Sequence, residues 1–201
     1  KRINVFREII ISNTQYKRKK VFAKIKKMQK KDFYDIFKAM NGRPVTIRLL
    51  DAPLHEFLPH NKDEMSAFLK YLNGGKKKPQ YNQREIQSIC ENLREFNPML
   101  GHRGCRIAVS YPEIYEMQIE SIFEAAYDLQ GEGIESEPEI MIPLIMNSDE
   151  LKLIVFGKKI EGATYRGLIE IERELREQLR KAAKQAGSKS KSKKKKQPFK
   201  E

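Results

Sequence analysis

Two arginines lie near or just after the ends of short apolar segments, where a fold can present them to a ligand. Arg48 lies inside the run VTIRLLD at residues 45–51, and Arg103 follows a second apolar stretch, NPML, at residues 97–100. A guanidinium group binds phosphate or carboxylate through a planar fork of N–H donors and stays charged at physiological pH. The two residues therefore predict a binding site for a small anion. The alternative is that each arginine pairs with a carboxylate inside the fold.

The apolar segments alternate with stretches of helical periodicity, so the chain is expected to fold as an α/β protein. Strands are predicted near residues 45–50, 97–100 and 139–144, parallel and adjacent in that order. Helices are predicted at residues 21–40, 61–73, 82–93, 110–131, from 147 onwards, and at 164–186. In parallel α/β folds the ligand site lies at the carboxyl ends of the strands, where both arginines would stand. Part of the sheet is expected to have an unpaired edge.

Several predicted helices begin with a polar residue that is followed three positions later by glutamate. This spacing is typical of a capping box, in which the two side chains satisfy the first free N–H groups of the helix. The pairs are Asn61 with Glu64, Asn82 with Glu85, Ser110 with Glu113, and Asn147 with Glu150. Pro112 also suits the first turn of its helix.

The composition excludes several classes of protein. Of the 201 residues, 39% are hydrophobic. No apolar run approaches the roughly 20 residues that span a bilayer, and the basic start does not match a secretory signal. Two cysteines, Cys90 and Cys105, are too few for a disulfide framework or a four-thiolate metal site. Cys90 falls on an apolar helical stripe, which indicates a small core residue. A reducing intracellular compartment is expected, and no glycine-rich nucleotide-binding motif is present.

The net charge of +13 is concentrated at the two ends of the chain. Residues 1–31 carry a net charge of +11 and residues 181–201 carry +8, which leaves the rest at −6. Nucleic-acid-binding domains usually place basic residues on a folded face, whereas this charge looks appended to an acidic body. The lysine-rich stretch before residue 31 suits a membrane-surface or calmodulin-target helix. We favour the other interpretation, a helix with one buried stripe and a solvated basic face.

The C-terminal end has the composition of a disordered segment. From Gly187 onwards the chain is rich in serine and lysine, and its lysines repel one another. Residues 187–201 are therefore predicted to be a disordered tail. The tail is either a solvated end or a weak polyanion-binding segment, without sequence preference because only Phe199 could stack on a base.

Four segments resemble the pyruvate, phosphate dikinase family, in the same order along the chain. They read VTIRLLDAPLHEFLP at 45–59, NPMLGHRGCR at 97–106, YPEIYEMQ at 111–118 and EPEIMIPL at 137–144. The resemblance implies the C-terminal phosphoenolpyruvate/pyruvate-binding domain, which is a (β/α)8 TIM barrel in that family. A full barrel needs about 250 residues, so the chain would hold a partial barrel, roughly strands two to four. The expected parts are a basic N-terminal helical segment (1–44), the partial barrel (45–186) and the tail (187–201).

The resemblance also implies roles for single residues. Arg48 and Arg103 match the arginines that bind the phosphoryl group of phosphoenolpyruvate. No catalytic residue and no metal ligand is expected in this chain, since the later strands have no counterpart here. In the family these strands carry the acidic Mg²⁺ ligands, an Asn-Asp pair and an acid/base cysteine. Neither Cys90 nor Cys105 matches that cysteine, and His102 does not match the family's phosphohistidine.

On this interpretation the chain is part of a reversible enzyme that converts ATP, pyruvate and phosphate to AMP, phosphoenolpyruvate and diphosphate. The resemblance implies Mg²⁺ as cofactor, and the ATP-binding and phosphohistidine domains of the full-length enzyme as partners. It also implies a homodimer and a cytoplasmic or organellar location, of which we expect the cytoplasm. No membrane or specific nucleic-acid partner is expected, and the isolated chain is expected to be inactive. The alternative is a truncated barrel that serves as a non-catalytic polyanion-binding or interaction protein.

Overall fold

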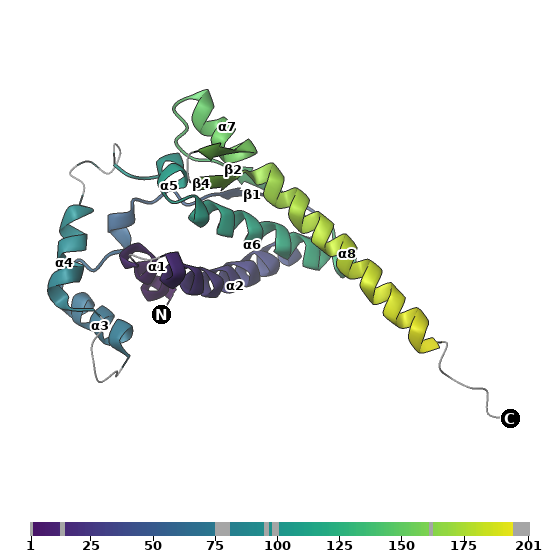
Figure 1. Ribbon diagram of the computed structural model, residues 1–201, viewed down its shortest axis with the longest axis horizontal. Coiled ribbons are helices and arrows are strands. Elements are labelled where there is room, and N and C mark those ends of the chain that lie inside the picture. Colours follow the sequence, from purple (N-terminus) through teal and green to yellow (C-terminus); the bar gives the residue numbers. More distant parts are fainter. Residues whose placement is uncertain are drawn as a thin grey trace.

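The computed structural model describes residues 2–12, 15–74, 81–94, 97, 101–160 and 163–194. Its helices are α1 (Arg2–Ile11), α2 (Gln15–Met40), α3 (Lys62–Asn73), α4 (Gln83–Asn92), α5 (Cys105–Ser110), α6 (Pro112–Gly131), α7 (Ser148–Phe156) and α8 (Leu168–Lys194), with a 3-10 helix, η1, at Leu54–Phe57. Its strands are β1 (Pro44–Arg48), β2 (Glu137–Met141), β3 (Gly157–Ile160) and β4 (Ala163–Arg166). This is a mixed α/β structure made mostly of helices, and α8 extends away from the body (Figure 1).

The described strands form two small sheets. β1 and β2 pair in parallel, with Thr46 opposite Glu139, and β3 and β4 form an antiparallel hairpin. Because β1 pairs directly with β2, the predicted order, in which residues 97–100 lie between them, is wrong. Asn97 is in neither helix nor strand, and 98–100 lie outside the described residues. Pro98 in this stretch lacks the N–H that a central strand needs, which weighs against the strand prediction. The unpaired sheet edge is confirmed for the described residues, since each sheet has two strands.

Helix α6 lies at the centre of the main hydrophobic core. Half of its twenty residues are buried, including the apolar residues Ile114, Met117, Ile122, Ala125 and Leu129. The residues that cover it come from α2, the end of β1, α5, α7 and α8, and include Phe37, Leu49, Ile107, Ile154 and Ile171. Burial of this apolar surface is the main force that assembles the elements.

A second cluster joins α1 to α3 and α4. Phe68 and Ile86 are fully buried in it together with Ile11. Arg7 of α1 is only 6% exposed, and its guanidinium donates to the backbone oxygen of Phe57 and to Glu64, each at 2.5 Å. These bonds satisfy a buried charge that would otherwise be costly, and they fix α1 against η1 and α3.

The predicted helix starts are largely confirmed. Asn82 and Asn147 form complete capping boxes with Glu85 and Glu150, and the side chain of Asn61 accepts the N–H of Glu64. Pro112 is in the first turn of α6, as expected, but Ser110 does not cap this helix. The reason is that Ser110 is the last residue of α5, and Tyr111 takes the N-cap position instead.

The C-terminal third departs most from the sequence predictions. The hairpin of β3 and β4 was not predicted, and Thr164, the expected first residue of the last helix, belongs to β4. The helix begins at Leu168 and continues past Gly187, the predicted start of the tail, to Lys194. Residues 195–201, the remainder of that tail, lie outside the described residues.

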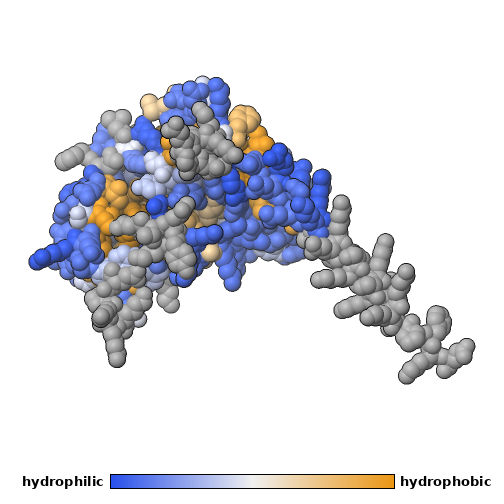
Figure 2. Space-filling view, viewed as in Figure 1, coloured by the Kyte–Doolittle hydropathy of each residue, from blue (hydrophilic) through white to orange (hydrophobic). Residues whose placement is uncertain are grey.

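The surface is largely hydrophilic on the face shown in Figure 2, with separate areas of exposed apolar side chains. The segment after β2 is apolar and partly exposed: Leu144 is 43% exposed, Ile145 37% and Met146 73%. Phe156 at the end of α7 is 65% exposed. The buried apolar stripe that was expected on α2 is incomplete, because Ile36 of this helix is 46% exposed.

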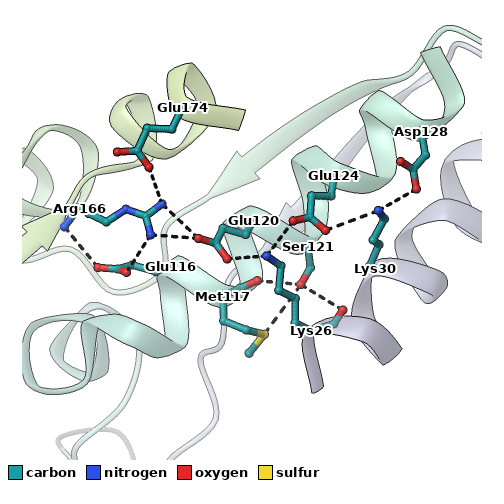
Figure 3. Close-up of polar contacts among 10 residues, drawn as sticks. All are labelled: Lys26, Lys30, Glu116, Met117, Glu120, Ser121, Glu124, Asp128, Arg166 and Glu174. Carbon is teal, nitrogen blue, oxygen red and sulfur yellow. Dashed lines mark hydrogen bonds and ion pairs between the residues drawn. The ribbon is translucent and has the colours of Figure 1, made fainter. Parts of the chain in front are cut away.

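Opposite charges line the contact between α2 and α6 (Figure 3). The ammonium group of Lys26 lies 2.7 Å from carboxylate oxygens of both Glu120 and Glu124. One turn further on, Lys30 lies 3.5 Å from Glu124 and 2.8 Å from Asp128. Residue numbers rise together along both helices, so α2 and α6 run parallel. The basic N-terminal segment is therefore packed into the fold through its charges rather than appended to it.

A second set of ion pairs joins α6 to the C-terminal elements (Figure 3). The guanidinium of Arg166, at the end of β4, lies 3.7 Å from Glu116, 3.1 Å from Glu120 and 3.0 Å from Glu174. The backbone N–H of Arg166 also donates to Glu116 at 3.3 Å. Arg166 therefore fixes the β3–β4 hairpin and the first turns of α8 against α6.

Replacement of Lys26 tests the contribution of this row of charges. Burial lowers the pKa of Lys26, but hydrogen bonds to Glu120 and Glu124 and their negative charges outweigh this effect and raise it. Lys26→Met leaves both carboxylates without this partner and should lower the free energy of unfolding by about 1–3 kcal/mol. Urea unfolding measures the change.

The matched control is Lys152→Met. Lys152 and Asp149 form an ion pair whose side chains are 65% and 88% exposed, and such pairs contribute about 0–1 kcal/mol. Equal losses of stability in the two variants would contradict a structural role for Lys26.

Candidate anion-binding site

The two predicted arginines meet at one carboxylate. Arg48, the last residue of β1, donates from Nη1 to Oδ2 of Asp51 at 3.3 Å. Arg103 donates from Nη2 to the same oxygen at 3.0 Å and from Nε to Oδ1 at 3.3 Å. Its Nε also donates to the backbone oxygen of Asp51 at 3.2 Å. The fold therefore brings together two guanidinium groups that are 55 positions apart in the sequence.

The two arginines differ in how firmly they are held. The side chain of Arg103 is 19% exposed and that of Asp51 is 14% exposed, whereas that of Arg48 is 61% exposed. Asp51 binds the Nε–Nη2 edge of Arg103 as a fork, but it contacts Arg48 through a single hydrogen bond. A bidentate contact fixes the plane of a guanidinium, and a single contact does not. Arg103 is thus the more rigid of the two cations.

Side chains of α6 bind the backbone of the segment that carries Asp51. The N–H of Leu49 continues the β1–β2 ladder by donating to Met141 at 3.0 Å. Leu50 is then bound on both sides, because its N–H donates to Gln118 at 2.9 Å and its carbonyl accepts from the hydroxyl of Tyr115 at 2.9 Å. The position of Asp51 is therefore set by two side chains of the core helix.

Gly104 brings the Arg103 side of the site against the end of β2. Its φ of 59° and ψ of −135° belong to a region that glycine adopts and other residues strongly avoid. A Cβ at this position would lie 2.9 Å from the Cβ of Leu144. The next residue, Cys105, donates its N–H to Pro143 at 3.1 Å and its thiol to Leu144 at 2.8 Å. Arg103 is therefore positioned by a close approach that requires glycine.

Burial favours the neutral forms of one tyrosine and of both cysteines. Burial raises the pKa of Tyr115, with smaller contributions from Cys105 and Asp51. Burial also raises the pKa of Cys105, and the nearby carboxylate of Glu150 adds to the effect. Cys90 is half-buried against the α3–α4 cluster, and burial raises its pKa as well. Both cysteines are thus packing residues and not activated thiolates, as the sequence indicated for Cys90.

Sequence reasoning found the two arginines but not the residues that hold them. Asp51 enters the sequence analysis only as the last residue of the run that holds Arg48, although it lies just three positions after Arg48. Tyr115 and Gln118 carry no local signal that they bind the backbone of Leu50. His102 packs its ring against Tyr111, with 5.8 Å between ring centroids.

The described residues offer no site that fits Mg²⁺. Within these ranges no group of three or more His, Cys, Asp and Glu side chains is placed to hold a metal ion, and Asp51 is bound by two arginines. A cavity of about 380 Å³ lies between α1, α2 and the start of α6, but the arginines do not line it. None of the helices in the described ranges is long and apolar enough to cross a membrane.

Comparison with known proteins places these features in a family. Residues 5–186 match the family described as PEP-utilising enzyme, PEP-binding domain. The chain belongs to this family. The match includes both arginines, Asp51 and the elements that position them.

Named relatives of the chain are pyruvate, phosphate dikinases. The enzyme of Treponema pallidum (strain Nichols) is 56% identical over 179 residues, which are 89% of this chain and 20% of the relative. The enzyme of Rhizobium meliloti (strain 1021) is 46% identical over 154 residues, 76% of this chain and 16% of the relative. The enzyme of Clostridium symbiosum is 42% identical over 154 residues, which are 76% of this chain and 17% of the relative. The chain thus spans about a fifth or less of the length of these relatives.

Gly104→Ala tests whether the close approach at Gly104 is required. The added methyl group meets Leu144 and forces an unfavourable backbone conformation, so the free energy of unfolding should fall by roughly 3 kcal/mol. Denaturant unfolding measures the loss. Gly131→Ala, near the end of α6, has no atom within 4 Å of the added Cβ and should be neutral or stabilising. A similar effect of both substitutions would contradict this account of the site.

Proposed function

We propose that the chain contributes the phosphoryl-binding arginines of the phosphoenolpyruvate/pyruvate site of a pyruvate, phosphate dikinase. The observation that carries the proposal is the convergence of Arg48 and Arg103 on one oxygen of Asp51. Membership of the PEP-binding domain family and the names of the relatives support it. The reaction is the reversible conversion of ATP, pyruvate and phosphate to AMP, phosphoenolpyruvate and diphosphate.

Two guanidinium groups in one place suit the chemistry of phosphoryl transfer. During transfer, negative charge spreads over the three equatorial oxygens of the phosphoryl group, and fixed cations stabilise that charge. Arg103 supplies a cation whose plane is already set, and Arg48 supplies a second that reaches solvent. The roles of these residues are to bind and orient the phosphoryl group. No proton-transfer group is assigned to this chain.

The remaining machinery is proposed to lie in other parts of the enzyme. The acid/base cysteine, the Mg²⁺ ligands, the ATP-binding domain and the phosphohistidine domain are all expected outside this chain. The described parallel pair of strands would then be one portion of a larger (β/α)8 barrel. A homodimer formed through that barrel and a cytoplasmic location belong to the same proposal.

Ligand titration tests the anion site. Arg48→Ala and Arg103→Ala should each weaken phosphoenolpyruvate binding by about 10-fold or more, because each removes charge-assisted hydrogen bonds to the phosphoryl group. Pyruvate has no phosphoryl group, so its binding should change less. Isothermal titration calorimetry measures the affinity of each variant for phosphoenolpyruvate and for pyruvate. The control is Arg84→Ala, which removes an exposed cation from α4. Equal weakening by the control would show only an effect of net charge.

The isolated chain is expected to lack dikinase activity. The reason is the absence of counterparts for the acid/base cysteine, the metal ligands and the phosphohistidine in the 201-residue sequence. A coupled assay with ATP, phosphate, pyruvate and Mg²⁺ checks this expectation against a blank without protein. Turnover above the blank, lost in Arg103→Ala, would overturn it.

A further inference from the structure

Asp51 is in an unusual position for a residue of an anion site. It places a negative charge in direct contact with the two cations that are proposed to bind a phosphoryl group. Its carboxylate is only 14% exposed, and both of its oxygens accept bonds from arginine. A carboxylate here competes with an anionic ligand, so its presence needs a physical reason.

The reason lies in the repulsion between the two guanidinium groups. Two like charges that contact one oxygen would separate without a counter-ion between them, and Arg48 is long and exposed enough to turn into solvent. Asp51 removes that repulsion in the absence of ligand. Asp51 holds the two arginines unequally, because it accepts a fork of two bonds from Arg103 and a single bond from Arg48.

We propose that Asp51 is the positioning residue of the anion site, holding Arg103 in a fixed plane and keeping Arg48 beside it as a movable arm. On ligand binding, Arg48 exchanges its single bond to Asp51 for the phosphoryl group, while Arg103 keeps its fork to Asp51. This inference rests on the proposed function of the two arginines.

The Asp51 carboxylate can affect the site in two ways, by holding the arginines in place and by its negative charge, and the two effects predict different consequences of its removal. The lost negative charge strengthens the attraction of the site for every anion alike. The lost fork should weaken the binding of phosphoenolpyruvate more than that of inorganic phosphate. Free phosphate is nearly symmetric and can turn to follow a displaced arginine, whereas the phosphoryl group of phosphoenolpyruvate is tied to a larger molecule that carries a carboxylate. The ratio of phosphoenolpyruvate to inorganic phosphate affinity therefore isolates the positioning effect from the charge effect.

The first experiment needs no ligand. In the full chain labelled with ¹⁵N-arginine, NMR measures rotation of each guanidinium about its Nε–Cζ bond. The rotation of Arg103 should be at least about tenfold slower than that of the exposed Arg84, because the fork to Asp51 restrains its Nε and Nη2 groups. This difference should disappear in Asp51→Asn and in Asp51→Ala. It should persist in Asp149→Asn, a control at an exposed aspartate. Rotation of Arg103 as fast as that of Arg84 in the unsubstituted chain would overturn the proposal, whether or not the variants fold.

The second experiment titrates phosphoenolpyruvate and inorganic phosphate separately into the chain and into Asp51→Asn. The ratio of the two affinities should fall by about tenfold or more in the variant, the equivalent of one well-placed charged hydrogen bond. A ratio that stays within about twofold would overturn the positioning role in favour of charge alone. If the unsubstituted chain binds neither ligand, the proposed function fails, and the NMR comparison still decides the role of Asp51.

Discussion

Helix α6 is apolar over so much of its surface that several elements must cover it at once, and the rest of the structure follows from this constraint. Half of its residues are buried, beneath α2, α5, α7, α8 and the residue that follows β1. Protein cores are packed as densely as crystals of small molecules. Packing on several sides therefore fixes both the rotation of the helix about its axis and its position along that axis. α6 therefore acts as the reference against which the two strands and the arginines are placed.

The link from this core to the anion site runs through two polar side chains on α6. Tyr115 and Gln118 are themselves buried, and they bind the carbonyl and the N–H of Leu50. These are backbone groups beyond the end of the β1–β2 pair, where a polar group away from water needs a partner. Because Asp51 is the next residue, satisfying Leu50 also sets the carboxylate that holds both arginines.

The sequence predicted the parts of this structure that local chemistry determines. The asparagine caps at residues 61, 82 and 147 depend on neighbours three positions away, and all three are present. The convergence of Arg48 and Arg103 was predicted as well, although the strand order from which it was argued is wrong. The pairing of β1 with β2 could not be read in the same way, because it joins residues about 90 positions apart. Asp51 was missed for a similar reason, since its importance depends on Arg103, which is distant in the sequence.

The distribution of charge shows how composition misleads when the partner of each charge is unknown. The N-terminal excess of +11 invites a polyanion-binding function, but Lys26 and Lys30 face acidic residues of α6 across a parallel helix contact. Their charges hold the fold together and are not available to a partner. Any binding of polyanions by this region would depend on the opposite face of α2, where Lys24, Lys27 and Lys31 are exposed. Such a row of lysines attracts phosphate groups without distinguishing one base from another, and this binding weakens as the salt concentration rises. Specific recognition is proposed instead for the two arginines that contact Asp51.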